Sequence, residues 1–333
     1  MIEFTIELAH KRIRISSLYN STKKFCQAYL CEDGEADITV VVDPSDIEFE
    51  RAKSAAEDEL EGIPVRRFSD KYLETLAVYR KIAERLIEDN ILLFHGSAIA
   101  VDGEAFLFTA KSGTGKSTHT RLWRETFGDR AVMVNDDKPL LLLRDGKVWV
   151  CGTPWDGKHR LSTNTIVPLS GICILERGAQ NTITPVSPQE ALSAVFEQSY
   201  RPKNLAKLLE VVEILTQSVD FYRLHCNMDP EAAVVAYNGM KNERMTSMKL
   251  KQGFVTREMG GEQIMVATGK ANFSGFTRAN ATGAFIVNCL KEETTVEKIV
   301  DAMAQVYDAP RDVLEADVLK IVEKLRSIGA IDE

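Results

Sequence analysis

The fold is decided by residues 105–118, AFLFTAKSGTGKST, an apolar strand that runs into a glycine-rich turn and the start of a helix. This order of elements is the context of a phosphate-binding loop, although Ala110 stands where the strict G-x-x-x-x-G-K-[ST] pattern has its first glycine. Gly113 and Gly115 allow the backbone to aim successive N–H groups inward, and the helix start adds partial positive charge. An ordinary glycine turn between a strand and a helix is the alternative, which the run GTGKST disfavours in this context.

The loop predicts a nucleotide site. We expect Lys116 to neutralise the β- and γ-phosphates of ATP, and the Ser117 hydroxyl to bind Mg²⁺. The residues expected to contact the nucleotide are Ser112, Gly113, Thr114, Gly115, Lys116, Ser117 and Thr118.

The composition is that of an ordinary globular protein. Of the 333 residues, 44% are hydrophobic and 27% are charged, and the length favours two domains. The net charge of −8 and the pI near 5.4 argue against a nucleic-acid partner. An acidic chain with a phosphate loop therefore indicates a local nucleotide site.

Cysteine usage and the N-terminus indicate the cellular compartment. The six cysteines form no C-x-x-C motif, and the five histidines show no zinc spacing, so we expect free thiols in a reducing cytosol. The N-terminus lacks the basic segment and apolar run of a signal peptide, and no apolar stretch reaches the roughly 18 residues of a membrane span. We therefore expect a cytoplasmic protein without a membrane partner.

The hydrophobic pattern changes along the chain. A β-rich part, residues 1–68, alternates with the period of strands, except for a polar stretch at 44–65 that is expected to be irregular. A helical pattern follows at 70–89. The charged run KNER at 241–244 precedes a module with three strand patterns and then three helical ones. The predicted domains are residues 1–243 and 244–333.

The dipeptide Asp102-Gly103 predicts how the sheet around the loop is built. It is a two-residue hairpin signal, so the strand that feeds the loop is expected to pair antiparallel with the strand just before it. In the common parallel-sheet NTPases a helix separates consecutive strands. The loop is therefore expected in a mixed or antiparallel sheet.

Two carboxylates, Asp136 and Asp137, follow the buried strand pattern at 131–134. One of them can hold Mg²⁺, and the other can accept the proton of an attacking hydroxyl. A second aspartate near the γ-phosphate suits transfer to an alcohol, whereas an ATPase needs to position water. The same pair also fits turn and cap positions.

Other candidate side chains each have a structural alternative. His95 ends a strand one hairpin upstream of the loop and could contact phosphate, but a lone histidine is often a satisfied structural residue. His119 either faces the site or caps the helix. Lys158 and Arg160 lie on a loop where they could stabilise a transferring phosphoryl group or be solvated. Trp155 on the same loop is either a core anchor or a nucleotide stack.

Three runs near the loop resemble the HPr kinase/phosphorylase and phosphoenolpyruvate-carboxykinase fold, and more closely its small HPr-kinase-like relatives. The resemblance covers about residues 70–180 and implies an α/β, mixed-sheet P-loop kinase domain. The runs are FHGSAI at 94–99, SGTGKST at 112–118 and NDD at 135–137.

This resemblance also implies roles for individual residues. Asp136 is expected to act as base toward a serine hydroxyl, with His95 near it and Lys116 on the phosphates, and these three are the expected catalytic residues. Ser117 and Asp137 are the expected Mg²⁺ ligands. Thr118 stands where the bifunctional kinases carry glutamate, and their long C-terminal signature loop is missing. These departures argue against phosphorylase activity and against HPr as the substrate.

The C-terminal module resembles the PqqD-like peptide chaperones, also called RiPP recognition elements. The resemblance implies a small α+β, winged-helix-like domain that binds a leader peptide as a strand added to its third strand, beside its last helix. Phe273 and Phe276 on the strand and Val318 and Val322 on the helix are expected to contact the peptide, with core packing as the alternative for the helix residues. The matching runs are FVTREMGGE (254–262), ANATGAFI (279–286), TTVEKIVDA (294–302) and IGAI (328–331).

Together the two resemblances imply an ATP-dependent kinase for a Ser or Thr hydroxyl of a ribosomally made precursor peptide, recruited through its leader. Two alternatives stay open: a kinase of a small-metabolite hydroxyl with a regulatory C-terminal domain, and a non-catalytic, nucleotide-gated peptide chaperone. The expected partner is the leader peptide. Other peptide-modifying enzymes and a homo-oligomer are further options, and no nucleic acid or membrane is expected.

Overall fold

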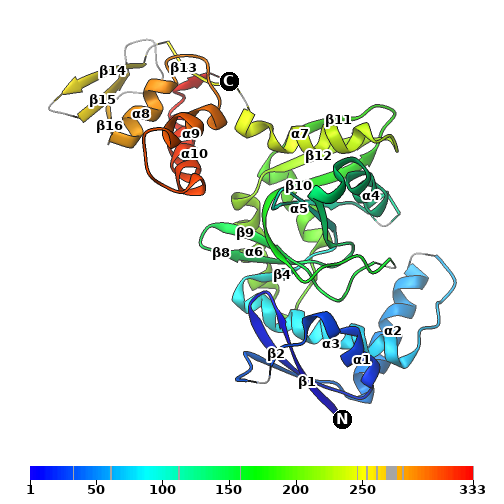
Figure 1. Cartoon of the computed structure of the whole chain (residues 1–333). Helices are drawn as coiled ribbons and strands as arrows, with labels where there is room; N and C mark the ends of the chain where they lie inside the picture. Colours follow the sequence, from blue (N-terminus) through cyan, green and yellow to red (C-terminus); the bar gives the residue numbers. More distant parts are fainter. Residues whose placement is uncertain are drawn as a thin grey trace. The chain divides into compact units, whose positions relative to one another are not determined.

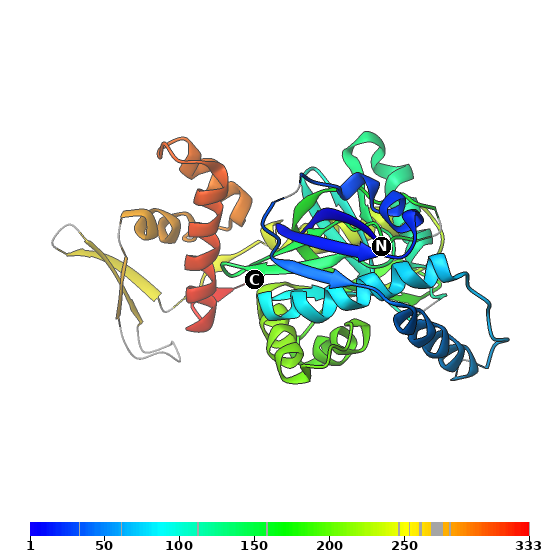
Figure 2. The same ribbon diagram turned by 90° about the horizontal axis from the view of Figure 1, so that it is seen from below.

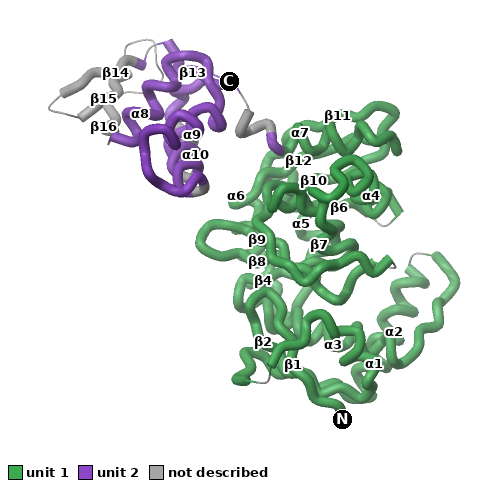
Figure 3. The backbone as a smooth tube through the Cα atoms, in the orientation of Figure 1, with its two compact units in different colours: residues 1–240 green, residues 241–333 purple. Residues whose placement is uncertain are grey.

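The computed structural model describes all residues except 33, 61, 112, 158, 246, 253, 260, 261, 268–275, 280 and 333. These residues form two compact units, Met1–Met240 and Lys241–Glu333, which Figure 3 shows in different colours. Within the described residues, no helix is both long enough and apolar enough to cross a membrane.

Unit 1 is built on a nine-stranded sheet, much of it green in Figure 1. Its strands are β4 (Ile91–Leu93), β5 (Ser97–Val101), β6 (Glu104–Thr109), β7 (Ala131–Asn135), β8 (Leu140–Arg144), β9 (Lys147–Cys151), β10 (Ile166–Arg177), β11 (Thr182–Val186) and β12 (Phe221–Cys226). The main strand order is β4-β8-β9-β10-β6-β5-β7, with β12 paired to β10 and β11 paired to β12. The first part of β10 pairs with β9, and its later part pairs with β6 and β12.

The turn Asp102-Gly103 forms the predicted hairpin. The φ angles of these residues are 54° and 84°, in the left-handed region that such two-residue turns require. Strand β5 pairs antiparallel with β6, with Ser97 opposite Phe108, whereas β10 pairs parallel with β6 on the other side. The sheet is therefore mixed at the strand that feeds the phosphate loop, which confirms the predicted fold class.

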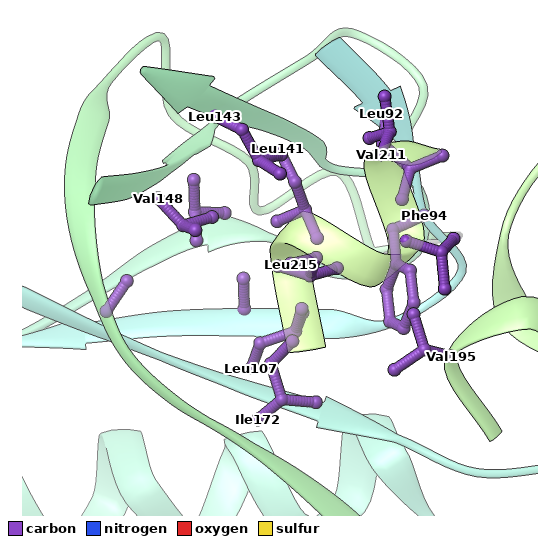
Figure 4. Packing of buried hydrophobic residues seen from close by; sticks show 14 of the residues in the cluster. Leu92, Phe94, Leu107, Leu141, Leu143, Val148, Ile172, Val195, Val211 and Leu215 are labelled. Carbon is purple, nitrogen blue, oxygen red and sulfur yellow. The ribbon is translucent and has the colours of Figure 1, made fainter. Parts of the chain in front are cut away.

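Helices cover both faces of this sheet, because alternate residues of a strand point to opposite sides. The four helices are α4 (Lys116–Phe127), α5 (Pro188–Gln198), α6 (Leu205–Ser218) and α7 (Glu231–Met245). Phe106 and Phe108 of β6 belong to the core cluster that includes residues of α4 and α7. Leu107 belongs to the cluster with α5 and α6, and Figure 4 shows it beside Leu215 of α6. The strand and helix that flank the phosphate loop are thus fixed by buried apolar side chains.

A smaller sheet and three helices complete unit 1. The elements are β1 (Ile2–Leu8), β2 (Lys11–Ser17), β3 (Ile38–Val41), α1 (Asn20–Phe25), α2 (Pro44–Leu60) and α3 (Asp70–Leu86). Figure 2 shows α3 running along this sheet. Buried residues of α3, including Val78 and Ile82, share one cluster with the small sheet and with Leu140 of β8. Helix α3 therefore joins the small sheet to the large one.

The expectation of irregular structure at 44–65 is wrong, because Pro44–Leu60 form helix α2. The periodicity did not indicate a helix, since part of its buried side is acidic instead of apolar. Asp46 and Glu50 are buried and pair with Arg80 of α3, at 3.0 and 2.5 Å. The register of α2 on α3 thus depends on ion pairs that a hydrophobic pattern does not reveal.

Unit 2 contains the predicted succession of three strands, β14 to β16, and three helices, α8 to α10, flanked by two short strands, β13 and β17, that pair with each other. Its elements are β13 (Lys249–Leu250), β14 (Phe254–Met259), β15 (Glu262–Ala267), β16 (Phe276–Ala279), α8 (Ala281–Cys289), α9 (Val296–Ala304), α10 (Arg311–Ser327) and β17 (Ile331–Asp332). Strands β14, β15 and β16 form an antiparallel sheet in that order, so β16 is an edge strand among the described residues.

Candidate active site

The phosphate loop lies between β6 and α4. Gly113 and Gly115 have φ angles of 75° and 128°, and open space surrounds the position that a Cβ would take at each. The Lys116 ammonium donates to the backbone oxygen of Ala110 at 2.9 Å, so it lies across the loop. Ser112 lies outside the described residues. The loop thus leaves room for phosphate oxygens at its glycines, next to the Lys116 charge.

Arg177, at the end of β10, donates hydrogen bonds to backbone carbonyl groups of the loop. Its Nη2 donates to the oxygen of Gly113 at 2.8 Å, and its Nε donates to that of Thr114 at 3.4 Å. The N–H and C=O groups of a trans peptide point in opposite directions. The contacts of Arg177 therefore fix two peptide planes of the loop with their N–H groups directed away from the guanidinium.

Asn135 builds the turn that carries the two aspartates. Its side chain is completely buried, and its Oδ1 accepts from the backbone N–H groups of Asp137 at 2.9 Å and Lys138 at 2.7 Å. Its Nδ2 donates to the Oγ1 of Thr153 at 3.0 Å. The turn is therefore fixed to the loop that follows β9.

Asp136 is buried, and a chain of hydroxyl groups ties it to α4. Its Oδ1 accepts from the hydroxyl of Ser97 at 3.1 Å, and Ser97 Oγ lies 3.0 Å from Oγ1 of Thr120. Next to its other oxygen lies Gly157, where a Cβ would come within 2.6 Å of Oδ2. This oxygen therefore faces a position without a side chain, while the first oxygen is held in place.

His95 lies beside Asp137, the aspartate expected to bind the metal. Its Nε2 is 3.6 Å from Asp137 Oδ1, and its Nδ1 is 2.9 Å from Oε1 of Gln198. Burial, followed by the positive charge of Lys116, lowers the pKa of His95, although Asp137 acts in the opposite direction. Burial also lowers the pKa of Lys116, against the pull of both aspartates. The pKa values of His95 and Lys116 therefore both depend on the charge of Asp137.

The loop between β9 and β10 is anchored by Trp155. Its ring stacks on Tyr79 of α3, with centroids 4.1 Å apart and 8° between the planes. Its Nε1 donates to the backbone oxygen of Thr75 at 2.7 Å. Trp155 is therefore a core anchor and does not stack on a nucleotide.

One cavity of about 730 Å³ collects most of the predicted site residues. His159 lines it, whereas Arg160 does not, because the Arg160 guanidinium pairs with Asp156 at 2.9 Å. Lys158 lies outside the described residues. The predicted residues that line the cavity are His95, Gly113, Gly115, Lys116, Ser117, Thr118, Asp136 and Asp137.

The oxygen donors of this cavity fit Mg²⁺. Ser117 and Asp137 supply a hydroxyl and a carboxylate, which are hard ligands, and Mg²⁺ commonly takes only one or two protein groups beside water and phosphate. No group of three or more His, Cys, Asp or Glu side chains that could hold a metal ion occurs among the described residues.

A second cavity, of about 550 Å³, lies on another side of the loop. Its lining includes Thr114, His119, Leu122 and Met228. Thr114 lines this cavity and a third one of about 540 Å³, but not the cavity of the aspartates. The loop thus borders space on more than one side.

His119 is part of the core. It is buried, and its Nε2 lies 3.0 Å from Nε1 of Trp123, which can only donate. Nε2 is therefore the acceptor, and Nδ1 carries the proton of the neutral ring. Burial lowers the pKa of His119 to about 4, so the ring is neutral at pH 7.

His119 is expected to make unit 1 less stable to unfolding as the pH falls. Its pKa is about 4 in the folded chain against 6.5 for an ordinary histidine, so the unfolded state binds more protons between these values. The free energy of unfolding therefore falls between pH 7 and pH 4, with a contribution from this group on the order of 3 kcal/mol. The three tryptophans, at 123, 149 and 155, all lie in unit 1, so their fluorescence during denaturant titration reports on this unit.

The variant His119→Gln tests this pH dependence. Glutamine has a side-chain acceptor for Trp123 and no titratable ring. Its unfolding midpoint is expected to fall less than that of the wild type when the pH is lowered from about 6.5 to about 4.5. Equal falls in the two proteins would contradict the assignment.

In unit 2 the predicted peptide contacts separate into two groups. Val318 and Val322 of α10 have no exposed surface and belong to the hydrophobic core of the unit. This corrects the expectation that they line a peptide groove, because a helix residue that packs inward presents nothing to a surface ligand. Phe273 lies outside the described residues, as does the side chain of Phe276, which begins the edge strand β16.

A family model described as Coenzyme PQQ synthesis protein D (PqqD) matches residues 262–331. This range lies within unit 2. Unit 2 therefore contains a PqqD domain, in agreement with the sequence analysis. No curated protein sequence is significantly similar to the chain.

Many solved structures are similar to the chain or to parts of it. TbiB1 in complex with the TbiA(beta) leader peptide is 21% identical, with a TM-score of 0.23, and the match covers 25% of this chain and 94% of that one. Lasso peptide synthetase B1 complexed with the leader peptide is 16% identical, with a TM-score of 0.24, over 26% of this chain and 100% of that one. The Hpr(Ser) kinase/phosphatase from Coxiella burnetii is 12% identical, with a TM-score of 0.26, over 46% and 96%.

The residues of the site themselves indicate its chemistry. The chain joins a mixed-sheet unit, which carries the glycine-rich run GTGKST between β6 and α4, to a C-terminal PqqD domain.

Proposed function

We propose that this chain is an ATP-dependent kinase that phosphorylates a Ser or Thr hydroxyl of a ribosomally made precursor peptide, whose leader the PqqD domain binds. The observation that carries this proposal is one cavity that brings Lys116 and Ser117 of the phosphate loop together with Asp136 and Asp137. A phosphate loop alone would serve an ATPase equally well. A buried carboxylate with one oxygen held by Ser97 suits the acceptance of a proton from an alcohol.

In the proposed reaction, Asp136 takes the hydroxyl proton on Oδ2 while Ser97 holds Oδ1. A bond forms between the hydroxyl oxygen and the γ-phosphorus as the bond from this phosphorus to the bridging oxygen breaks, which releases ADP. Lys116 and the loop amides offset the negative charge on the transferring group. Ser117 and Asp137 would hold Mg²⁺, which would supply further neutralisation of the phosphate charge.

The PqqD domain supports the choice of a peptide as substrate. In the family that this domain resembles, a leader peptide binds as an added strand, and β16 is an edge strand among the described residues. A bound leader would hold the acceptor segment at a high local concentration near the kinase unit. The leader then determines which peptide is phosphorylated, and the cavity determines which hydroxyl reacts.

The proposal is tested by incubating the full chain with Mg-ATP and a precursor peptide that carries both a leader and an acceptor segment with Ser or Thr. The peptide mass is expected to increase by one phosphoryl group, and a leader-free peptide is expected to react about 10²-fold more slowly at low concentration. Phosphate on a free small alcohol at the same rate with and without the PqqD domain would favour the metabolite kinase. An unchanged peptide mass would contradict the kinase proposal.

A further inference from the structure

Helix α4 presents different side chains to different cavities. Ser117, Arg121 and Arg124 line the cavity that contains the aspartates, whereas His119 and Leu122 line the second cavity. Residues three and four apart lie on the same face of a helix. The face that begins at Ser117 therefore continues to Arg124, seven residues and about 10 Å further along the axis.

The side chain of Arg124 has no hydrogen-bond or ion-pair partner among the described residues. Its Nε is buried and makes no hydrogen bond. Leaving a buried donor of a charged group unsatisfied costs free energy, so such a group calls for an explanation. Within the part of the chain that the structure describes, Arg121, one turn earlier, pairs only with Glu125 on its own helix at 2.8 Å, and both side chains are about half exposed. Exposed pairs at this spacing are weak and readily exchanged.

The acidic side chains of the cavity interact with Lys116, and its two arginines have no acidic partner among the described lining residues. Among its described lining residues the only carboxylates are Asp136 and Asp137, and both interact electrostatically with Lys116. Arg121 and Arg124 thus face the cavity without a carboxylate that balances them there. A planar guanidinium binds a carboxylate or a phosphate through two parallel hydrogen bonds.

We propose that Arg124, assisted by Arg121, binds an anionic group of the acceptor peptide close to the hydroxyl that is phosphorylated. This inference rests on the proposed kinase function and names the class of acceptor: a Ser or Thr with a carboxylate nearby. An extended peptide advances about 3.3 Å per residue, so the distance of about 10 Å between the metal end and Arg124 corresponds to a carboxylate within about three residues of the hydroxyl.

A peptide offers such a carboxylate from two sources, an Asp or Glu side chain or its own C-terminus. Both form the same paired hydrogen bonds with a guanidinium. The test therefore uses leader-free acceptor peptides in four forms: unchanged, with nearby acidic side chains replaced by amides, with an amidated C-terminus, and with both changes. The peptide that loses affinity identifies the source.

Binding of each fluorescently labelled peptide to the full chain is measured by anisotropy in the presence of Mg-ADP, for the wild type and for Arg124→Gln. We expect Arg124→Gln to weaken binding of the unchanged peptide about 10- to 100-fold. The neutralised peptide should bind the wild type equally weakly and lose nothing further in the variant, which is the signature of a direct pair in a double-mutant cycle. Arg124→Lys should restore only part of the affinity, because it lacks the paired donors.

Arg144→Gln is the matched control, since Arg144 is an exposed arginine of the same unit and does not line the cavity. It should bind all peptides like the wild type. Equal losses for the charged and the neutralised peptides in Arg124→Gln would overturn the proposal. A weaker affinity for Mg-ADP in this variant, with unchanged peptide binding, would also overturn it and assign Arg124 to the nucleotide.

The binding readout separates this inference from the proposed function. If no peptide gains phosphate but the affinity still depends on the pairing of Arg124 with a carboxylate, the kinase proposal fails and the anion site stands. If phosphate is transferred but Arg124→Gln changes the affinity for the charged and the neutralised peptides by the same factor, the kinase proposal stands and the anion site fails.

Discussion

Replacing Asp136 by asparagine is expected to lower the rate of phosphoryl transfer to the peptide by about 10²- to 10⁴-fold, the range of a lost general base. Asparagine has nearly the same size and can still accept a hydrogen bond from Ser97 through its carbonyl oxygen. It cannot take up the proton of the hydroxyl. Single-turnover transfer, followed by peptide mass, measures the loss, and the affinity for Mg-ATP should change little.

The matched control is Asp129→Asn, which removes an exposed carboxylate from the segment just before β7. It should transfer phosphate at the wild-type rate. Transfer by Asp136→Asn within a few-fold of this control would rule out Asp136 as the base. It would also favour the reading of Asp136 as a turn residue.

Asn135→Ala is expected to damage both stability and transfer. The alanine leaves the partly buried N–H groups of Asp137 and Lys138 without their acceptor and the buried Oγ1 of Thr153 without its amide donor. Unsatisfied buried groups of this kind cost about 1–3 kcal/mol each, so we expect a loss of about 2–4 kcal/mol in the free energy of unfolding. Misplacement of the aspartates should lower transfer by about 10²-fold even in the folded fraction.

Tryptophan fluorescence during denaturant unfolding measures the first effect, and transfer at a temperature where the variant is folded measures the second. Asn164→Ala is the control, because Asn164 is an exposed asparagine whose Nδ2 donates to the backbone oxygen of Ala28 at 2.9 Å. It should stay within about 0.5 kcal/mol of the wild type. A similarly small effect of Asn135→Ala would show that the turn keeps its shape without this side chain.

The parts of the fold that local chemistry specifies could be predicted from the sequence. Asp102-Gly103 dictates a tight turn, and the turn dictates antiparallel pairing of the strands beside it. The apolar alternation of β6 and the glycines after it likewise depend only on neighbouring residues. For this reason the mixed sheet and the place of the phosphate loop in it followed from a few short runs.

Contacts between distant residues escaped prediction. Arg177 reaches Gly113 across 64 residues of sequence, and nothing near Arg177 indicates that β10 ends beside the loop. Two features between nearby residues were also missed. Arg160 was expected near phosphate, but the buried carboxylate of Asp156 pairs with it four residues away. The helical spacing of Arg121 and Arg124 from Ser117 was present in the sequence and would have indicated a shared face.

The course of β10 has a consequence for the synthesis of the chain. The strand β6 and the glycine turn leave the ribosome early, but β6 is an edge until β10 pairs with it in parallel, and the carbonyls of Gly113 and Thr114 lack their Arg177 donor until residue 177 is made. Such long-range parallel pairing forms late in folding. A nascent chain that ends before residue 177 therefore holds the nucleotide motif without the complete parallel pairing of β6 and without the arginine that binds the loop. Affinity for ATP should first appear in ribosome-bound chains long enough to release β10, which makes nucleotide binding a reporter of the moment at which the sheet closes.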